Sequence, residues 1–137
     1  MRDPEISYFE LQAYTGATKH MGGFESTKEL IQLCHIEEDM VVLDVGAGVG
    51  ATACYLAREH GCRVVGVDAR ELPFPDTQFD VVLAESVTTF IRGKQLAVGE
   101  YARVTRPGGY VGMNEEIWLK TPPQRLIEYV QRTWSIE

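Results

Sequence analysis

The sequence predicts an α/β protein with three layers, in which helices cover both faces of a mostly parallel sheet of about four strands. Three observations predict this fold class. An apolar strand at 40–45 runs through a glycine-rich turn into a helix at 51–60. A second apolar strand at 63–68 follows directly. An apolar strand at 81–84 and a strand at 110–117 that ends in polar residues alternate with a helical segment at 94–103. Such alternation is typical of βαβ units, which form parallel sheets.

The first strand ends with an acidic residue ahead of the glycine-rich turn. Met40–Val45 is apolar and β-branched except at Asp44, which suits a strand covered on both faces. Gly46, Gly48 and Gly50 allow the backbone to turn sharply and to approach a ligand, and the helix that follows leaves N–H donors free at its start. This pattern indicates a site for a nucleoside cofactor.

Four helices are expected to present an apolar stripe to the sheet or to a neighbour. Ser26 or Thr27 is the expected cap of the first, and Gly61 is the expected stop of the second. The expected helices and inward residues are 28–34 with Leu30, Ile31 and Leu33; 51–60 with Ala53, Leu56 and Ala57; 94–103 with Leu96, Ala97, Tyr101 and Val104; and 125–134 with Leu126, Ile127, Val130 and Trp134. A short amphipathic helix is also expected over Ser7–Ala13.

Composition places the chain among soluble globular proteins with a single domain. The chain has 137 residues, 45% of them hydrophobic and 24% charged, and a net charge of −7. The negative charge argues against nucleic-acid and anionic-membrane partners, and no signal peptide or long apolar run is visible. Three cysteines, Cys34, Cys54 and Cys62, show no metal-ligand spacing, so we expect reduced thiols in a cytoplasmic protein and no metal site.

The segment Asp44 to Gly50 resembles motif I of the class I S-adenosylmethionine-dependent methyltransferases, in which an acid and one further residue precede Gly-x-Gly-x-Gly. Asp44, Gly46, Gly48 and Gly50 match that pattern. Two alternatives remain open. Gly46, Gly48 and Ala51 also satisfy the looser pattern of nicotinamide-binding turns, although Asp44 would repel a pyrophosphate there. A glycine turn that binds nothing is the second alternative.

Three further segments resemble the same family and occur in the family's order. They are the second strand ending in Asp68, the entry into the next strand at 72–83, and the turn at 101–110 with Pro107-Gly108-Gly109. The resemblance covers about Leu30 to Glu116. Within the family, the chain is similar to the methyltransferases that act on small molecules. It implies a Rossmann-like methyltransferase fold, S-adenosylmethionine as cofactor and S-adenosylhomocysteine as product.

The chain departs from the family after Asp68, where only three residues precede Leu72 instead of a helix, a strand and a loop. We interpret this as an internal deletion, and the family's last helix and strands are missing as well, so a truncated fold is expected. Pro73 and Pro75 forbid a helix in the connection, which leaves the second strand as a poorly covered sheet edge. Such an edge favours a homodimer, formed either by a two-fold contact or by exchange of elements.

The resemblance assigns candidate site residues within three parts of the single domain 1–137. These parts are an N-terminal lid and outer helix (1–39), a cofactor-binding core (40–116) and a C-terminal helix (117–137). Asp44 would orient the cofactor's ammonium group and Asp68 would hold its ribose. The expected cofactor-binding residues are Asp44, Gly46, Ala47, Gly48, Gly50, Asp68, Ala69, Glu85 and Ser86.

The acceptor side of the site carries fewer signals. His20 is the candidate general base, with an exposed loop histidine as the alternative. The expected substrate-binding residues are Tyr14, Met21, Asn114 and Glu115; the alternative for the last two is solvated strand ends, and the alternative for Ser86 is a cap. Three hypotheses for the whole chain follow: an active small-molecule methyltransferase, an inactive relic that still binds the cofactor, and a self-associating fragment.

Overall fold

Four strands form one parallel sheet in the computed structural model, which describes residues 14, 20, 22–67 and 72–134. The order across the sheet is β2-β1-β3-β4, and each neighbouring pair is parallel. The strands are β1 (Val41–Val45), β2 (Arg63–Val67), β3 (Phe79–Glu85) and β4 (Thr105–Asn114). The predicted three-layer α/β fold with a parallel sheet of about four strands is therefore confirmed.

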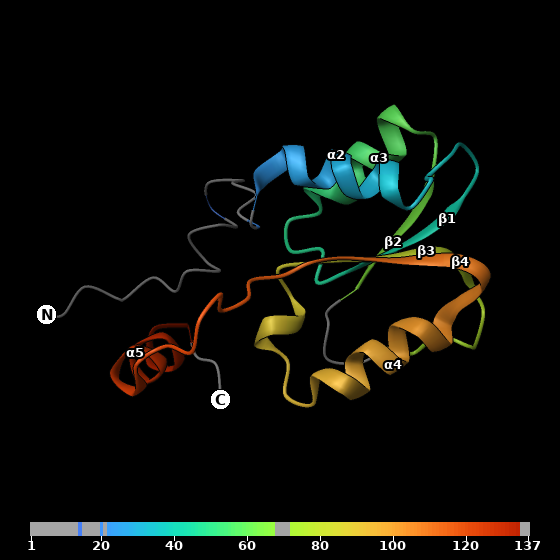
Figure 1. Ribbon diagram of the computed structural model, residues 1–137. Coiled ribbons are helices and arrows are strands. Elements are labelled where there is room, and N and C mark those ends of the chain that lie inside the picture. Colours follow the sequence, from blue (N-terminus) through green and yellow to red (C-terminus); the bar gives the residue numbers. More distant parts are fainter. Residues whose placement is uncertain (1–13, 15–19, 21, 68–71, 135–137) are drawn as a thin grey trace, which may run out of the picture.

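Helices cover the sheet from both sides (Figure 1). Helices α2 (Gly23–Leu33) and α3 (Ala51–Glu59) lie on one face, and α4 (Lys94–Val104) lies on the other. Because side chains alternate along a strand, each face receives every second residue of β1 and β3. Val42, Val81 and Leu83 pack in the cluster with Leu30, Ile31 and Leu56. Leu43, Val82 and Ala84 pack in the cluster with Tyr101 and Val104.

The inward stripes of the helices differ in part from those expected. Helix α2 begins at Gly23, so Ser26 and Thr27 lie inside it and neither is its cap. Leu33 and Leu96 are 70% and 79% exposed, and Ala57 is exposed as well. These three expectations were wrong, because a hydrophobic residue at helical spacing is buried only where a neighbouring element reaches it. Thr52 takes an inward place on α3.

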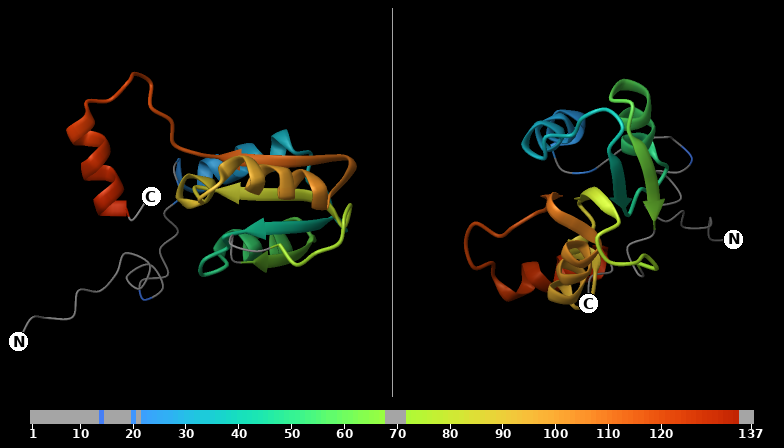
Figure 2. Two further views of the ribbon diagram at one scale, coloured as in Figure 1. Left: turned by 90° about the horizontal axis from the view of Figure 1, so that it is seen from below. Right: turned by 90° about the vertical axis from the view of Figure 1, so that its right-hand side faces the viewer.

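The C-terminal helix α5 (Gln124–Trp134) lies apart from the three layers in Figure 1 and in the left-hand view of Figure 2. Leu126 and Tyr129 on this helix are 39% and 55% exposed. The expected packing of Leu126 is therefore wrong. No helix in the described part of the chain is long and apolar enough to cross a membrane.

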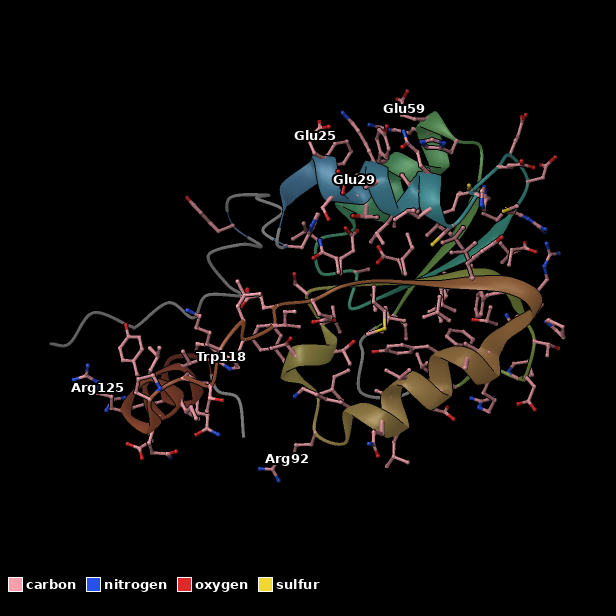
Figure 3. All side chains as sticks on the ribbon, viewed as in Figure 1. Glu25, Glu29, Glu59, Arg92, Trp118 and Arg125 are labelled. Carbon is pink, nitrogen blue, oxygen red and sulfur yellow. The ribbon has the colours of Figure 1, made fainter. Side chains whose placement is uncertain are left out.

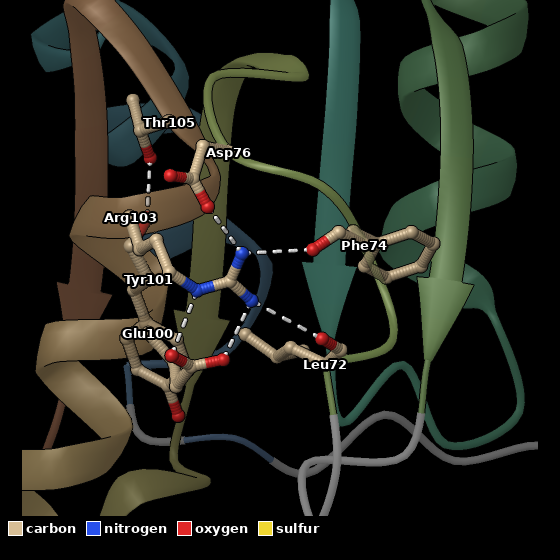
Figure 4. A network of polar contacts seen from close by, with 7 residues as sticks. All are labelled: Leu72, Phe74, Asp76, Glu100, Tyr101, Arg103 and Thr105. Carbon is tan, nitrogen blue, oxygen red and sulfur yellow. Dashed lines mark hydrogen bonds and ion pairs between the residues drawn. The ribbon is translucent and has the colours of Figure 1, made fainter.

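The connection that follows β2 contains no helix over 72–78, as its two prolines predicted. Arg103 of α4 holds this segment, donating to the carbonyls of Phe74 (2.9 Å) and Leu72 (3.3 Å) and to Asp76 (2.8 Å) (Figure 4). Leu72 and Phe74 pack against the α4 side of the core. The segment thus covers part of the face from which a crossover helix is absent.

Strand β2 forms the edge of the sheet. Within the described residues it pairs with β1 alone, and its burial is low throughout, with Val65 36% exposed. The predicted exposed edge is confirmed.

Candidate cofactor site

Three polar side chains meet at the carboxyl ends of neighbouring strands. Asp44 lies opposite Leu83 in the register of β1 and β3, and Glu85 lies opposite Asn114 in that of β3 and β4. Alternation along the strands puts Asp44, Glu85 and Asn114 on the face that α2 and α3 cover. The chain therefore places two carboxylates under two helices, at the edge where parallel α/β sheets bind ligands.

Glu85 is bound by side chains from three directions. Its Oε2 accepts a hydrogen bond from Thr27 of α2 at 2.9 Å, and its Oε1 accepts one from Thr52 of α3 at 3.0 Å. The Nδ1 atom of His20 lies 3.4 Å from Oε2, and Nε2 of the same ring lies 3.1 Å from the Thr27 hydroxyl. The side chains of His20 and Glu85 are only 10% and 5% exposed. The alternative of a solvent-exposed His20 is therefore excluded.

Asp44 is buried, and one of its oxygens lacks a partner. The residue is 4% exposed, and Oδ2 has no hydrogen-bond partner among the described residues. Burial, followed by repulsion from Glu85, raises the pKa of Asp44 to about 7, while the backbone N–H of Ala53 acts against this shift. Burying a carboxylate oxygen without a hydrogen-bond partner costs free energy. This oxygen can therefore accept a hydrogen bond from a cationic or hydrogen-bond-donating ligand.

The glycine-rich turn adopts a backbone conformation that favours glycine. Gly46, Gly48 and Gly50 have φ values of 70°, 53° and 80°, in the left-handed region that favours glycine. Gly50 is the residue that precedes α3, and the N–H of Gly46 donates to the carbonyl of Val67 at 2.7 Å. A side chain at Gly46 would also overlap Val87. Gly48 is exposed, and Ala47 and Gly50 are partly exposed, so a ligand can reach the backbone there.

Glu115, Asn114 and Ser86 make hydrogen bonds that mainly stabilise the fold. Glu115 accepts hydrogen bonds from the backbone N–H groups of Val87, Thr88 and Thr89, at 3.2, 2.7 and 3.1 Å, and thereby caps the short helix η1 (Thr88–Phe90). Asn114 donates to the Ser26 hydroxyl at 2.6 Å. The N–H of Ser86, a residue with φ 52°, donates to the carbonyl of Asn114 at 2.6 Å.

Four further candidates are Asp68, Ala69, Met21 and Tyr14. Asp68, Ala69 and Met21 lie outside the described residues. Tyr14 is 91% exposed. Among the described residues, no group of three or more His, Cys, Asp or Glu side chains could hold a metal ion.

Sequence reasoning missed the two threonines that bind Glu85. Thr27 and Thr52 are fully and almost fully buried, at 0% and 7% exposure, close to the start of their helices. A signal was available, because Thr27 precedes Leu30 and Ile31 at helical spacing and so shares their inward stripe. Their hydroxyls identify the carboxyl end of β3 as a polar centre of the fold.

The described residues fit the nucleoside cofactor that the sequence implies. The glycine turn exposes backbone beside the start of α3, and the free Oδ2 of Asp44 suits an ammonium group. Acidic side chains such as Glu25 and Glu59 lie exposed on the outer side of α2 and α3 (Figure 3). Asp44 and Glu85 differ from these surface carboxylates because both are buried. Fold and site together define a Rossmann-like protein with two buried carboxylates at the carboxyl ends of its strands.

Comparison with known proteins agrees with this class. A family model described as a methyltransferase domain matches residues 68–113. An uncharacterized protein of Haemophilus influenzae is 27% identical, over 84% of this chain and 58% of its own length. Phosphoethanolamine N-methyltransferase 1 of Arabidopsis thaliana is 25% identical over 81% of this chain. Sterol 24-C-methyltransferase of Eremothecium gossypii is 30% identical over 85% of this chain.

The solved structures are similar in fold. Phosphoethanolamine N-methyltransferase 2 of Haemonchus contortus, in complex with S-adenosyl-L-methionine, has a TM-score of 0.79 and 21% identity over 91% of this chain and 37% of its own. A putative sarcosine dimethylglycine methyltransferase from Galdieria sulphuraria has a TM-score of 0.77 and 16% identity, over 93% of this chain and 66% of its own. Sequence and fold confirm the resemblance to the class I S-adenosylmethionine-dependent methyltransferases. The chain spans 28% and 40% of the length of the plant and fungal methyltransferases named above.

Proposed function

We propose that the chain binds S-adenosylmethionine and transfers its methyl group to a small-molecule acceptor. The observation that carries this proposal is the unpartnered, buried Oδ2 of Asp44 beside a glycine turn in the left-handed conformation. A zwitterionic amino-acid group offers the ammonium that this oxygen lacks. A dinucleotide pyrophosphate would instead meet the negative charges of Asp44 and Glu85.

Under this proposal, each residue has a role. The backbone of Gly46, Ala47, Gly48 and Gly50 approaches the methionine part of the cofactor, and Asp44 orients its ammonium group. Asp68 and Ala69, which directly follow β2, take the ribose side. An acceptor nucleophile would attack the sulfonium methyl in line, with S-adenosylhomocysteine as the leaving group, so the protein contributes alignment and exclusion of water. His20, held by Glu85 and Thr27, is the base for an acceptor that must lose a proton.

Calorimetric titration tests the cofactor. We expect S-adenosylmethionine and S-adenosylhomocysteine to bind and NAD to bind at least tenfold more weakly, because a dinucleotide brings its own negative charges to an acidic site. Binding of NAD without binding of S-adenosylhomocysteine would reject the proposal.

The acceptor is tested by transfer of a labelled methyl group. The names of the relatives suggest phosphoethanolamine and a sterol as first acceptors. Transfer to either supports an active methyltransferase. Cofactor binding without transfer to a broad panel of small molecules would instead favour the inactive relic.

Self-association and a cytoplasmic location complete the proposal. The exposed edge β2 supports a homodimer, and the three free cysteines support a reducing compartment. We expect sedimentation at micromolar concentration to give a dimer that buries more than about 1,000 Å² in total. A monodisperse monomer under the same conditions would exclude the dimer.

A further inference from the structure

The carboxylates of Asp44 and Glu85 form a buried acidic pair with little positive charge nearby. Asp44 comes from β1 and Glu85 from β3, and the two residues are 4% and 9% exposed. Among the described contacts of the pair, His20 from the segment ahead of α2 is the only group that can carry positive charge. The contacts from α2 and α3 are the hydroxyls of Thr27 and Thr52 and the N–H of Ala53, which do not titrate.

The hydrogen bonds of the pair are distributed unequally. Each oxygen of Glu85 accepts a hydrogen bond from a threonine hydroxyl, whereas Oδ2 of Asp44 accepts none from the part of the chain that the structure describes. Two carboxylates that share a buried site do not both ionise easily, and a proton on one of them relieves their repulsion. Asp44 has the free oxygen, so it is the member of the pair on which that proton resides.

We propose that the ammonium group of the bound cofactor takes the place of this proton, and that Glu85 is the second carboxylate of the ammonium site. The inference rests on the proposed function. It adds Glu85 as a second ligand of the ammonium group, and it adds the exchange of the Asp44 proton for that group. The cation enters between the two carboxylates, the carboxyl proton of Asp44 leaves to solvent, and the pair becomes fully ionised around the bound cation. The net charge at the carboxylate pair is therefore the same before and after the ammonium group binds.

Calorimetry in buffers of different ionisation enthalpy measures the released proton directly. S-adenosylhomocysteine is the probe, because it carries the ammonium group and does not react. Since the pKa of Asp44 is raised to about 7, we expect release of roughly half a proton per ligand at pH 7 and about tenfold tighter binding at pH 8 than at pH 6. The compound 5′-methylthioadenosine, which lacks the amino-acid part, should bind without releasing a proton.

The variant Glu85→Gln separates this role from a structural one. It removes the repulsion that adds to burial in raising the pKa of Asp44, so we expect weaker binding, a smaller proton release at pH 7 and a smaller change of affinity between pH 6 and pH 8 than in the unmodified protein. If Glu85 only ties Thr27 and Thr52 together, the variant would release as much proton as the unmodified protein does. Glu59→Gln, an equal charge change on the exposed side of α3, should behave as the unmodified protein does.

The outcomes separate the two proposals. Binding of S-adenosylhomocysteine without proton release overturns the exchange and leaves the proposed function intact. Equal proton release with 5′-methylthioadenosine also overturns the exchange. Absence of any binding overturns both. If Glu85→Gln does not fold, the comparison of the two ligands on the unmodified protein still decides.

Discussion

Asp44→Asn is expected to stabilise the unliganded protein above pH 7 while it weakens the cofactor. In an unfolded chain an aspartate ionises at its ordinary pKa of 3.8, whereas burial and Glu85 raise the pKa of Asp44 to about 7. Between these values the folded protein binds more protons than the unfolded chain, so stability falls as pH rises from about 4 to 7. A shift of this size corresponds to a loss of about 1–4 kcal/mol.

Denaturant unfolding at pH 4 to 8 measures this effect. The variant cannot ionise at residue 44, so the difference in unfolding free energy between the variant and the unmodified protein should grow with pH and level off above pH 7. Asp39→Asn is the matched control, because Asp39 is exposed and lies just ahead of β1, at the opposite end of the strand. A constant difference across the pH range would show that Asp44 titrates as an ordinary aspartate.

The same variant should bind S-adenosylhomocysteine at least tenfold more weakly at pH 8. An amide cannot form the charge-assisted hydrogen bond, which contributes about 1.5–3 kcal/mol. Gain of stability together with loss of affinity is typical of a ligand site, since a group kept for the fold would lower stability when replaced. Affinity equal to that of the unmodified protein would remove Asp44 from the site.

Gly46→Ala should destabilise the protein more than any other alanine substitution in the glycine turn. The φ of 70° costs a side chain about 1–2 kcal/mol, and the added methyl group overlaps Val87, with about 1–3 kcal/mol more for overpacking. We expect a total loss of about 2–5 kcal/mol in unfolding free energy, together with loss of cofactor binding.

Gly48→Ala is the matched control. The φ of Gly48 is also positive, at 53°, but the nearest atom to an added Cβ is the carbonyl oxygen of Gly46 at 3.9 Å. This variant should lose only the backbone contribution. Adding Val87→Ala to Gly46→Ala should recover part of the stability, since it removes the overlapping methyl groups. Equal losses for Gly46→Ala and Gly48→Ala, measured by chemical denaturation, would show that Val87 moves aside without cost.

Sequence alone was sufficient for β1, β2, β3 and the glycine turn, because each depends on local patterns. The strand expected at 110–117 was wrong in its bounds: β4 spans Thr105–Asn114, so Pro107-Gly108-Gly109 lie inside the strand. The β-branched run at 40–45 and the glycines after it fix a strand and a turn wherever they occur. The ends of parallel strands must share one edge, so Asp44, Glu85 and Asn114 could be placed near each other in advance. The two prolines after Asp68 likewise excluded a helix before β3.

Tertiary structure alone decided which partners these side chains have. Thr27 and Thr52 bind Glu85 because α2 and α3 cross the sheet at the carboxyl ends of its strands, and no local pattern specifies that crossing. Arg103 of α4 donates hydrogen bonds to the segment 72–76, and Leu33 and Leu96 stay exposed within the described residues although both have helical spacing. Burial depends on contacts between residues far apart in the chain, and so does the ionisation of Asp44, whose charge is opposed by Glu85 from a strand 41 residues further on.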